Sequence, residues 1–129
     1  MASSRFAYDK TYDPPIPALP VIVYNSDAEL STSSFVALVD TGADGTLIPV
    51  SHLRSVQAYP VAEAFLRSHW GERRRVHLFR VDFRIDEISL PGVTVIGDDL
   101  GQEIILGRDV LNKLRLFLDG PLNEIEVRE

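Results

Sequence analysis

Apolar residues occur along this chain in short runs and in alternation with polar residues, the two patterns that are typical of β-strands. The clearest alternation extends from His77 to Ile85, where odd-numbered positions form a mostly apolar face and even-numbered positions a mostly polar one. Short apolar runs predict further strands at residues 21–24, 35–39, 88–90, 93–96, 104–106, 116–118 and 124–127. The pattern therefore predicts an all-β or mostly β protein.

Helical periodicity is limited to two short segments. Arg108–Leu114 is predicted to be a helix because its apolar residues share one face, and Asp109 lies in the first turn, where the helix dipole favours an anion. Residues 50–56 predict a single helical turn. The expected architecture is thus a mostly β domain with one short C-terminal helix.

Turn-forming residues divide the strands into hairpins. Residues 61–85 have room for a long hairpin with its tip at 68–72, and residues 116–127 predict a second hairpin at the C-terminal end. Pro91 and Gly92 predict a turn that separates the strands on either side of them.

The N-terminal segment has a different composition, since residues 1–20 contain four of the eight prolines. Proline disfavours helix and favours extended backbone, so the sequence predicts an extended arm over residues 1–20 and a single domain over residues 21–129. Within the arm, residues 5–8 fit either a short edge strand or a loosely held segment.

Composition limits the class of protein. A chain of 129 residues with 45% hydrophobic residues suits one domain. The net charge of −6 argues against nucleic-acid binding, and the lack of cysteine excludes disulfides and thiolate metal sites. With no apolar signal core and no stretch of membrane-spanning length, the sequence predicts a cytoplasmic protein with no membrane partner.

One acidic residue follows a buried strand directly. Asp40 ends the apolar run 35–39 and is followed by a loop of glycine, alanine and small hydroxyl residues up to Thr46. A second apolar run, 47–50, begins immediately afterwards. Such a loop exposes a carboxylate to a substrate while its glycines allow close approach of another backbone. Apolar neighbours can also perturb the pKa of such a group, so Asp40 is a candidate catalytic acid or base.

Two segments carry a resemblance to a known family. Leu38–Asp44, which reads LVDTGAD, resembles the active-site signature of aspartic proteases, and Ala43-Asp44 after Asp-Thr-Gly resembles its retroviral branch, the retropepsins. Ile104–Leu111 resembles the segment that in retropepsins crosses behind the active-site loop and opens the helix. Order and separation both match, over roughly residues 20 to 120.

The resemblance implies a retropepsin-like acid protease fold that is closed by homodimerisation. A chain of this length has one Asp-Thr-Gly, so a pair of catalytic carboxylates requires two copies of Asp40 related by two-fold symmetry. The implied activity is that of an aspartic endopeptidase on peptide or protein substrates, with Asp40, Thr41 and Gly42 as catalytic residues. Neither a metal nor a cofactor is needed.

The same resemblance implies which residues hold the substrate. These belong to the active-site loop and to the tip of the predicted hairpin, the flap of retropepsins, and are Gly42, Ala43, Asp44, His69, Trp70 and Gly71. Gly107 and Arg108 are expected to support the loop, with Arg108 paired to Asp44. If that pair is buried, loss of one partner is expected to be costly.

The sequence leaves three questions open, which concern the activity, the arginine cluster and Trp70. A catalytically weak or inactive retropepsin-like module for dimerisation or peptide binding is the alternative function, because the predicted flap has only one glycine beside a bulky Trp70. The arginines at 67 and 73–75 fit either selection of acidic substrate residues or a solvated hairpin face. Trp70 itself fits either a cover over the substrate or a partly buried aromatic. The three histidines lack metal-ligand spacing and are expected to be structural.

Overall fold

A strand of thirteen residues, β7 (Arg73–Ile85), is the longest element of the fold and pairs with three others. The computed structural model describes residues 3–67 and 70–129. Phe79, Val81, Phe83 and Ile85 of β7 are buried, as the alternation predicts. His77 differs from that prediction, because it is exposed while its neighbour Val76 is buried.

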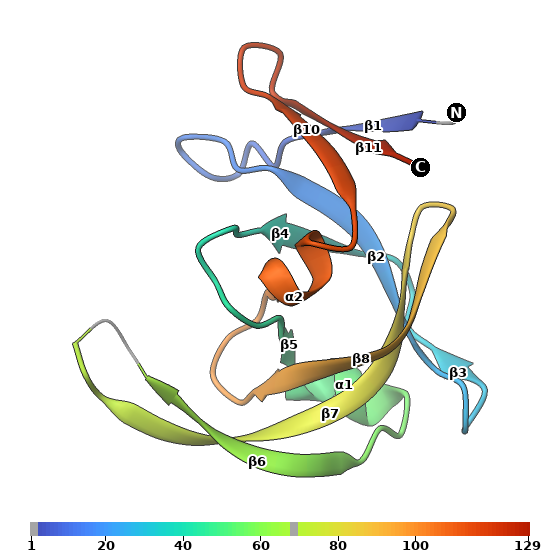
Figure 1. Cartoon of the computed structure of the whole chain (residues 1–129), viewed down its shortest axis with the longest axis vertical. Coiled ribbons are helices and arrows are strands. Elements are labelled where there is room, and N and C mark those ends of the chain that lie inside the picture. Colours follow the sequence, from blue (N-terminus) through green and yellow to red (C-terminus); the bar gives the residue numbers. More distant parts are fainter. Residues whose placement is uncertain (1–2, 68–69) are drawn as a thin grey trace.

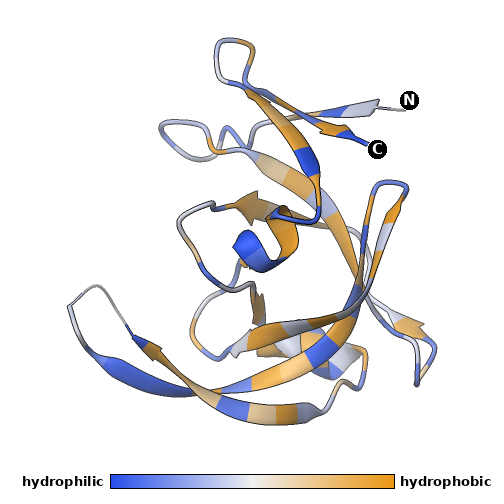
Figure 2. Cartoon of the chain, viewed as in Figure 1, coloured by the Kyte–Doolittle hydropathy of each residue, from blue (hydrophilic) through white to orange (hydrophobic). Residues whose placement is uncertain are grey.

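The main sheet is curled into a barrel (Figure 1). In spatial order it contains β3 (Leu30–Ser31), β2 (Ala18–Asn25), β4 (Phe35–Val39), β9 (Ile104–Leu106), β5 (Leu47–Pro49), β8 (Ile88–Asp98), β7 and β6 (Pro60–Arg67). An additional pairing of β2 with β7 closes the ring. Hydrophobic and hydrophilic residues alternate along β6 and β7 (Figure 2). Large side chains fill the interior, with the most completely buried being Phe83, Leu19, Ile48, Leu53, Ile85, Ile104, Leu106 and Ile125.

Strand pairing brings together the two segments that resemble retropepsins, residues 38–44 and 104–111. β4 pairs with β9, and β5 pairs with β8, while Leu47 of β5 also faces Ile105 of β9 in antiparallel register. The loop between β4 and β5 therefore lies directly beside the end of β9. This is the loop that carries Asp40.

Both ends of the described chain meet in a second, three-stranded sheet. β11 (Glu124–Arg128) lies between β1 (Ser3–Ala7) and β10 (Arg115–Asp119), and all pairings are antiparallel. The predicted C-terminal hairpin is thus confirmed, and of the two readings of the N-terminal segment the edge strand is the one observed. The division predicted at residue 20 falls inside β2, because Pro20 has the extended backbone that a strand requires.

Two short helices lie within the described residues. α1 (Val50–Ser55) confirms the predicted helical turn, and α2 (Arg108–Leu111) is shorter than the predicted range 108–114. The chain after α2 tightens into turns in which Lys113 and Leu114 donate to carbonyls three residues back, at 3.0 Å each. Such i→i+3 hydrogen bonds commonly end a helix.

The predicted turn at Pro91-Gly92 is wrong, because β8 runs through it as one strand from Ile88 to Asp98. The register with β7 shifts at this point, and Gly92 has φ +64, which suits glycine. The freed N–H of Gly92 donates to Asp82 Oδ1 at 2.8 Å. A bulge therefore replaces the turn.

No helix among residues 3–67 and 70–129 is long and apolar enough to cross a membrane.

Replacing Phe83 by alanine is expected to destabilise the domain by about 3–5 kcal/mol, since the ring is 1% exposed and its removal leaves a cavity where β7 crosses the core. Urea unfolding followed by circular dichroism measures this. Arg80→Ala, an exposed position on the same strand, is the matched control and is expected to stay within about 0.5 kcal/mol of the original protein. Equal stability of the two variants would contradict the buried position of Phe83.

Candidate active site

Asp40 is exposed and stands immediately after the buried end of β4. Its backbone N–H donates to the carbonyl of Leu106 at 3.0 Å, which ties it to β9. Its side chain is oriented by the N–H of Gly42, which donates to Oδ1 at 2.9 Å. A Cβ at Gly42 would lie 3.2 Å from the same oxygen, so the close turn around the carboxylate favours glycine.

The segment after β9 packs against the Asp40 loop from behind. Arg108 N–H donates to the carbonyl of Ala43 at 2.9 Å. A Cβ added to Gly107 would lie 2.3 Å from the carbonyl oxygen of Gly45, so no side chain fits there. Both backbones approach each other too closely for any residue but glycine, which explains Gly107 as a support of the loop.

The predicted ion pair between Asp44 and Arg108 is present, but it is not buried. The side chain of Asp44 is 93% exposed and that of Arg108 45% exposed. Pairs of this kind contribute little to stability, so the large cost expected for a buried pair does not apply. Arg108 also donates from Nη1 to the carbonyl of Thr41 at 2.9 Å, and so one guanidinium joins both ends of the loop.

A buried hydrogen-bond network lies beneath the loop, and the sequence did not reveal it. Thr46, which is 0% exposed, donates its hydroxyl hydrogen to Asp109 Oδ1 at 2.7 Å and accepts the N–H of Gly107 at 3.0 Å. Asp109 Oδ1 also accepts its neighbour's N–H, that of Val110, at 2.8 Å. The only sequence signal was an acid in the first turn of a helix, which does not identify a partner 63 residues away.

The β6–β7 hairpin is observed where the flap was predicted. Gly71 has φ +84, a backbone conformation that favours glycine. Trp70 is 89% exposed, which excludes the reading of a partly buried aromatic. His69, also predicted to contact the substrate, lies outside the described residues. The distal end of the hairpin, the loop after β4 and the loop after β8 lie on the same side of the molecule (Figure 1).

The described histidines have structural partners. The ring centroid of His52 lies 4.2 Å from that of Phe35, and burial lowers the pKa of His52 below its usual value. His77 Nε2 lies 3.4 Å from Glu63 Oε1. Residues 3–67 and 70–129 contain no cluster of three or more histidine, aspartate or glutamate side chains that could hold a metal ion.

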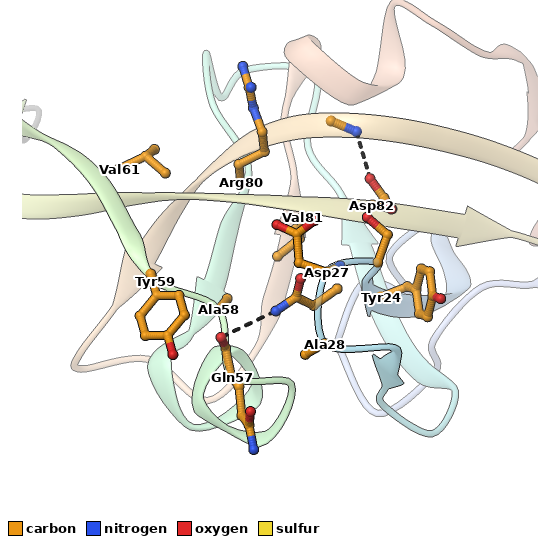
Figure 3. A pocket seen from close by; sticks show the side chains of 13 residues that line it. Tyr24, Asp27, Ala28, Gln57, Ala58, Tyr59, Val61, Arg80, Val81 and Asp82 are labelled. Carbon is orange, nitrogen blue, oxygen red and sulfur yellow. Dashed lines mark hydrogen bonds between the residues drawn. The ribbon is translucent and has the colours of Figure 1, made fainter.

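A cavity of about 690 Å³ lies elsewhere on the barrel, between the turn after β2, the start of β6 and the middle of β7. Figure 3 shows Asp27 between Tyr24 and Tyr59, with Asp82 above Tyr24. None of the predicted site residues lines it. Asp40 lies outside this cavity, on an exposed loop.

The chain matches no protein-family model, and no curated protein matches it in sequence. Its structure is similar to that of a retropepsin-like aspartic protease from Rickettsia conorii (10% identity, TM-score 0.67, 98% of this chain and 90% of that chain). It is also similar to EIAV protease complexed with the inhibitor HBY-793 (19% identity, TM-score 0.57, 76% of this chain and 86% of that chain).

A third similar structure is a foamy viral protease–reverse transcriptase in complex with double-stranded DNA, at 17% identity and a TM-score of 0.55. It matches over 77% of this chain but only 16% of that chain. The three likenesses establish the fold, which is mostly β and retropepsin-like, as the sequence predicted.

Thr46→Val is expected to lower the free energy of unfolding by about 1–3 kcal/mol, because it leaves the buried N–H of Gly107 without its acceptor. Asp44→Asn, which weakens only the exposed pair with Arg108, is expected to cost less than about 1 kcal/mol. Urea unfolding of both variants at one protein concentration measures the difference. A larger effect from Asp44→Asn would mean that the exposed pair, and not the buried network, stabilises the loop.

Proposed function

We propose that this protein is a homodimeric aspartic endopeptidase in which two copies of Asp40 activate a water molecule. The observation that carries the proposal is the position of Asp40. It is exposed at the end of a buried strand, and its carboxylate is oriented by the N–H of Gly42 on a loop that the segment after β9 supports from behind. In a retropepsin-like fold, a chain with a single Asp-Thr-Gly aspartate in this position supplies one of the two carboxylates of a catalytic dyad.

The chemistry follows from bringing two carboxylates together. Two facing carboxylates do not both ionise readily, so at acidic pH they share one proton and titrate as a pair; the aspartic-protease dyad is a standard example. The ionised carboxylate then accepts a proton from the water, which attacks the peptide carbonyl carbon. The protonated carboxylate donates toward the carbonyl oxygen, and collapse of the tetrahedral intermediate breaks the C–N bond as the nitrogen takes up a proton.

The second copy is proposed to meet this one along the Asp40 loop and the three-stranded sheet. In that sheet β11 is already paired on both sides, so β1 and β10 are the strands with a free edge. Phe117 and Leu118 of β10 are 50% and 45% exposed, which are apolar surfaces that a partner would cover. Thr41 is proposed to hydrogen-bond across this interface.

The substrate is proposed to lie between the Asp40 loop and the β6–β7 hairpin. In this arrangement Gly42, Ala43 and Asp44 contact the peptide backbone from one side, and His69, Trp70 and Gly71 cover it from the other. Gly107 and Arg108 act by holding the loop. The whole of residues 21–129 is proposed to form the protease domain, with residues 1–20 as its N-terminal arm.

Asp40→Asn is expected to reduce peptide cleavage by at least about 100-fold, because the dyad loses its general base and its shared proton. A diverse peptide mixture incubated at pH 4 to 7 and read by mass spectrometry measures this. Circular dichroism is expected to be unchanged, since the carboxamide oxygen can still accept the N–H of Gly42. Undiminished cleavage by the variant would overturn the mechanism. If neither protein cuts while both are folded and dimeric, the inactive peptide-binding module becomes the better description.

Mixing the original protein with Asp40→Asn is expected to inhibit it. If both form dimers at random, an equal mixture leaves about half of the original activity per active chain, and a ninefold excess leaves about one tenth, because mixed dimers have one carboxylate. Measurement of cleavage after equilibration of the mixture tests this, with the same amount of Arg80→Ala added in place of Asp40→Asn as the control. Activity that is independent of the added variant would show that a single chain is sufficient.

A further inference from the structure

The arginines at the end of the β6–β7 hairpin divide between its two faces. In the register of the hairpin, Arg75 is opposite Phe65 and Arg74 is opposite Leu66. Residues directly opposite each other share a face of a sheet, so Arg75 lies with Phe65 and Arg74 lies on the other side. The guanidinium carbons of Arg73 and Arg75 are 4.5 Å and 5.9 Å from the Phe65 ring centroid, as this division requires.

The face of Arg74 lies on the side of the loop that carries Asp40. Val76 and Leu78 share this face with Arg74, and Leu78 is opposite Ile96 of β8. The side chain of Ile96 reaches the Asp40 loop, because its Cδ1 lies 2.9 Å from where a Cβ of Gly45 would be. Arg74 is therefore placed further along the same surface, toward the end of the hairpin.

Arg74 also lies next to the loop that follows β8. Its Nη2 is 3.8 Å from Asp98 Oδ1, which is longer than a hydrogen bond. That oxygen already accepts the N–H groups of Leu100 and Gly101, each at 2.9 Å. The side chain of Arg74 is 41% exposed. The guanidinium thus retains donors for another carboxylate.

Arg74 is a positively charged side chain beside an acidic surface. Asp40 and Asp44 make the exposed part of the active-site loop acidic, and Arg108 is engaged by Asp44 and by the carbonyl of Thr41. A planar guanidinium binds a carboxylate with two parallel hydrogen bonds, which gives both attraction and orientation. Arg74 offers this group on the inner face of the hairpin.

We propose that Arg74 is a specificity-determining residue that binds an aspartate or glutamate side chain of the peptide substrate. The proposal rests on the proposed function, since it assumes that peptide lies between the hairpin and the Asp40 loop. Asp98 competes for the same guanidinium, so it weakens the selection of acidic residues. The three arginines at 67, 73 and 75 on the outer face have no part in it.

The test compares the cleavage profiles of a peptide mixture for the original protein, Arg74→Gln, Arg74→Glu and Asp98→Asn, with Arg73→Gln as the matched outer-face control. At one position near the cut, the original protein is expected to favour acidic over neutral residues by about 2- to 5-fold at low salt, and less in 0.5 M salt. Arg74→Gln is expected to abolish the preference, and Arg74→Glu to reverse it toward lysine and arginine. Arg73→Gln is expected to retain the preference of the original protein for acidic residues.

Asp98→Asn is expected to strengthen the preference, because the carboxamide oxygen still accepts from Leu100 and Gly101 while the competing charge is gone. An unchanged profile in both Arg74 variants, with cleavage still dependent on Asp40, would overturn the assignment of Arg74 and leave the protease intact. If the original protein does not cut, the protease proposal fails by itself. In that case, fluorescence anisotropy measures the affinity of the Asp40→Asn protein for two peptides that differ only in one Glu or Gln. Equal affinity for the two peptides overturns the role of Arg74. Tighter binding of the Glu peptide, lost when Arg74→Gln is added, supports that role.

Discussion

The hydroxyl of Thr46 makes the contacts on which the candidate site depends. It joins Asp109 and the N–H of Gly107 in the interior, where unsatisfied polar groups are costly. With this network in place, the segment after β9 lies directly behind the Asp40 loop, and the carbonyls of that loop approach Gly107 so closely that no side chain fits. A buried framework of this kind holds an exposed side chain in a fixed position.

Although the framework beneath it is buried, Asp40 itself lies on an exposed surface of the chain. A single chain offers one Asp-Thr-Gly aspartate, Asp40, on an exposed loop and a sheet with free edges at β1 and β10. Both features suit a second copy placed by two-fold symmetry, which would cover the apolar surface and bring a second carboxylate to the first. Stability and activity of this protein are therefore proposed to depend on its concentration.

The hairpin formed by β6 and β7 has two chemically different faces near its end. On one face arginines stack against Phe65, and on the other Arg74 approaches Asp98 at the margin of the candidate site. A strand directs successive side chains to opposite faces, so neighbouring residues of one type can have unrelated roles. For this reason, arginines that are neighbours in the sequence do not form a single surface in the fold.

The sequence by itself determined most of the strands and the terminal hairpin, because alternation and short apolar runs are local patterns, and two short motifs carried the resemblance that predicted the retropepsin-like fold. Tertiary structure decided the rest. It exposed the Asp44–Arg108 pair that was expected to matter if buried, converted the Pro91-Gly92 turn into a bulge of β8, and joined Thr46 to Asp109. Burial and partners 60 or more residues apart depend on how the barrel closes, and no local pattern records that closure.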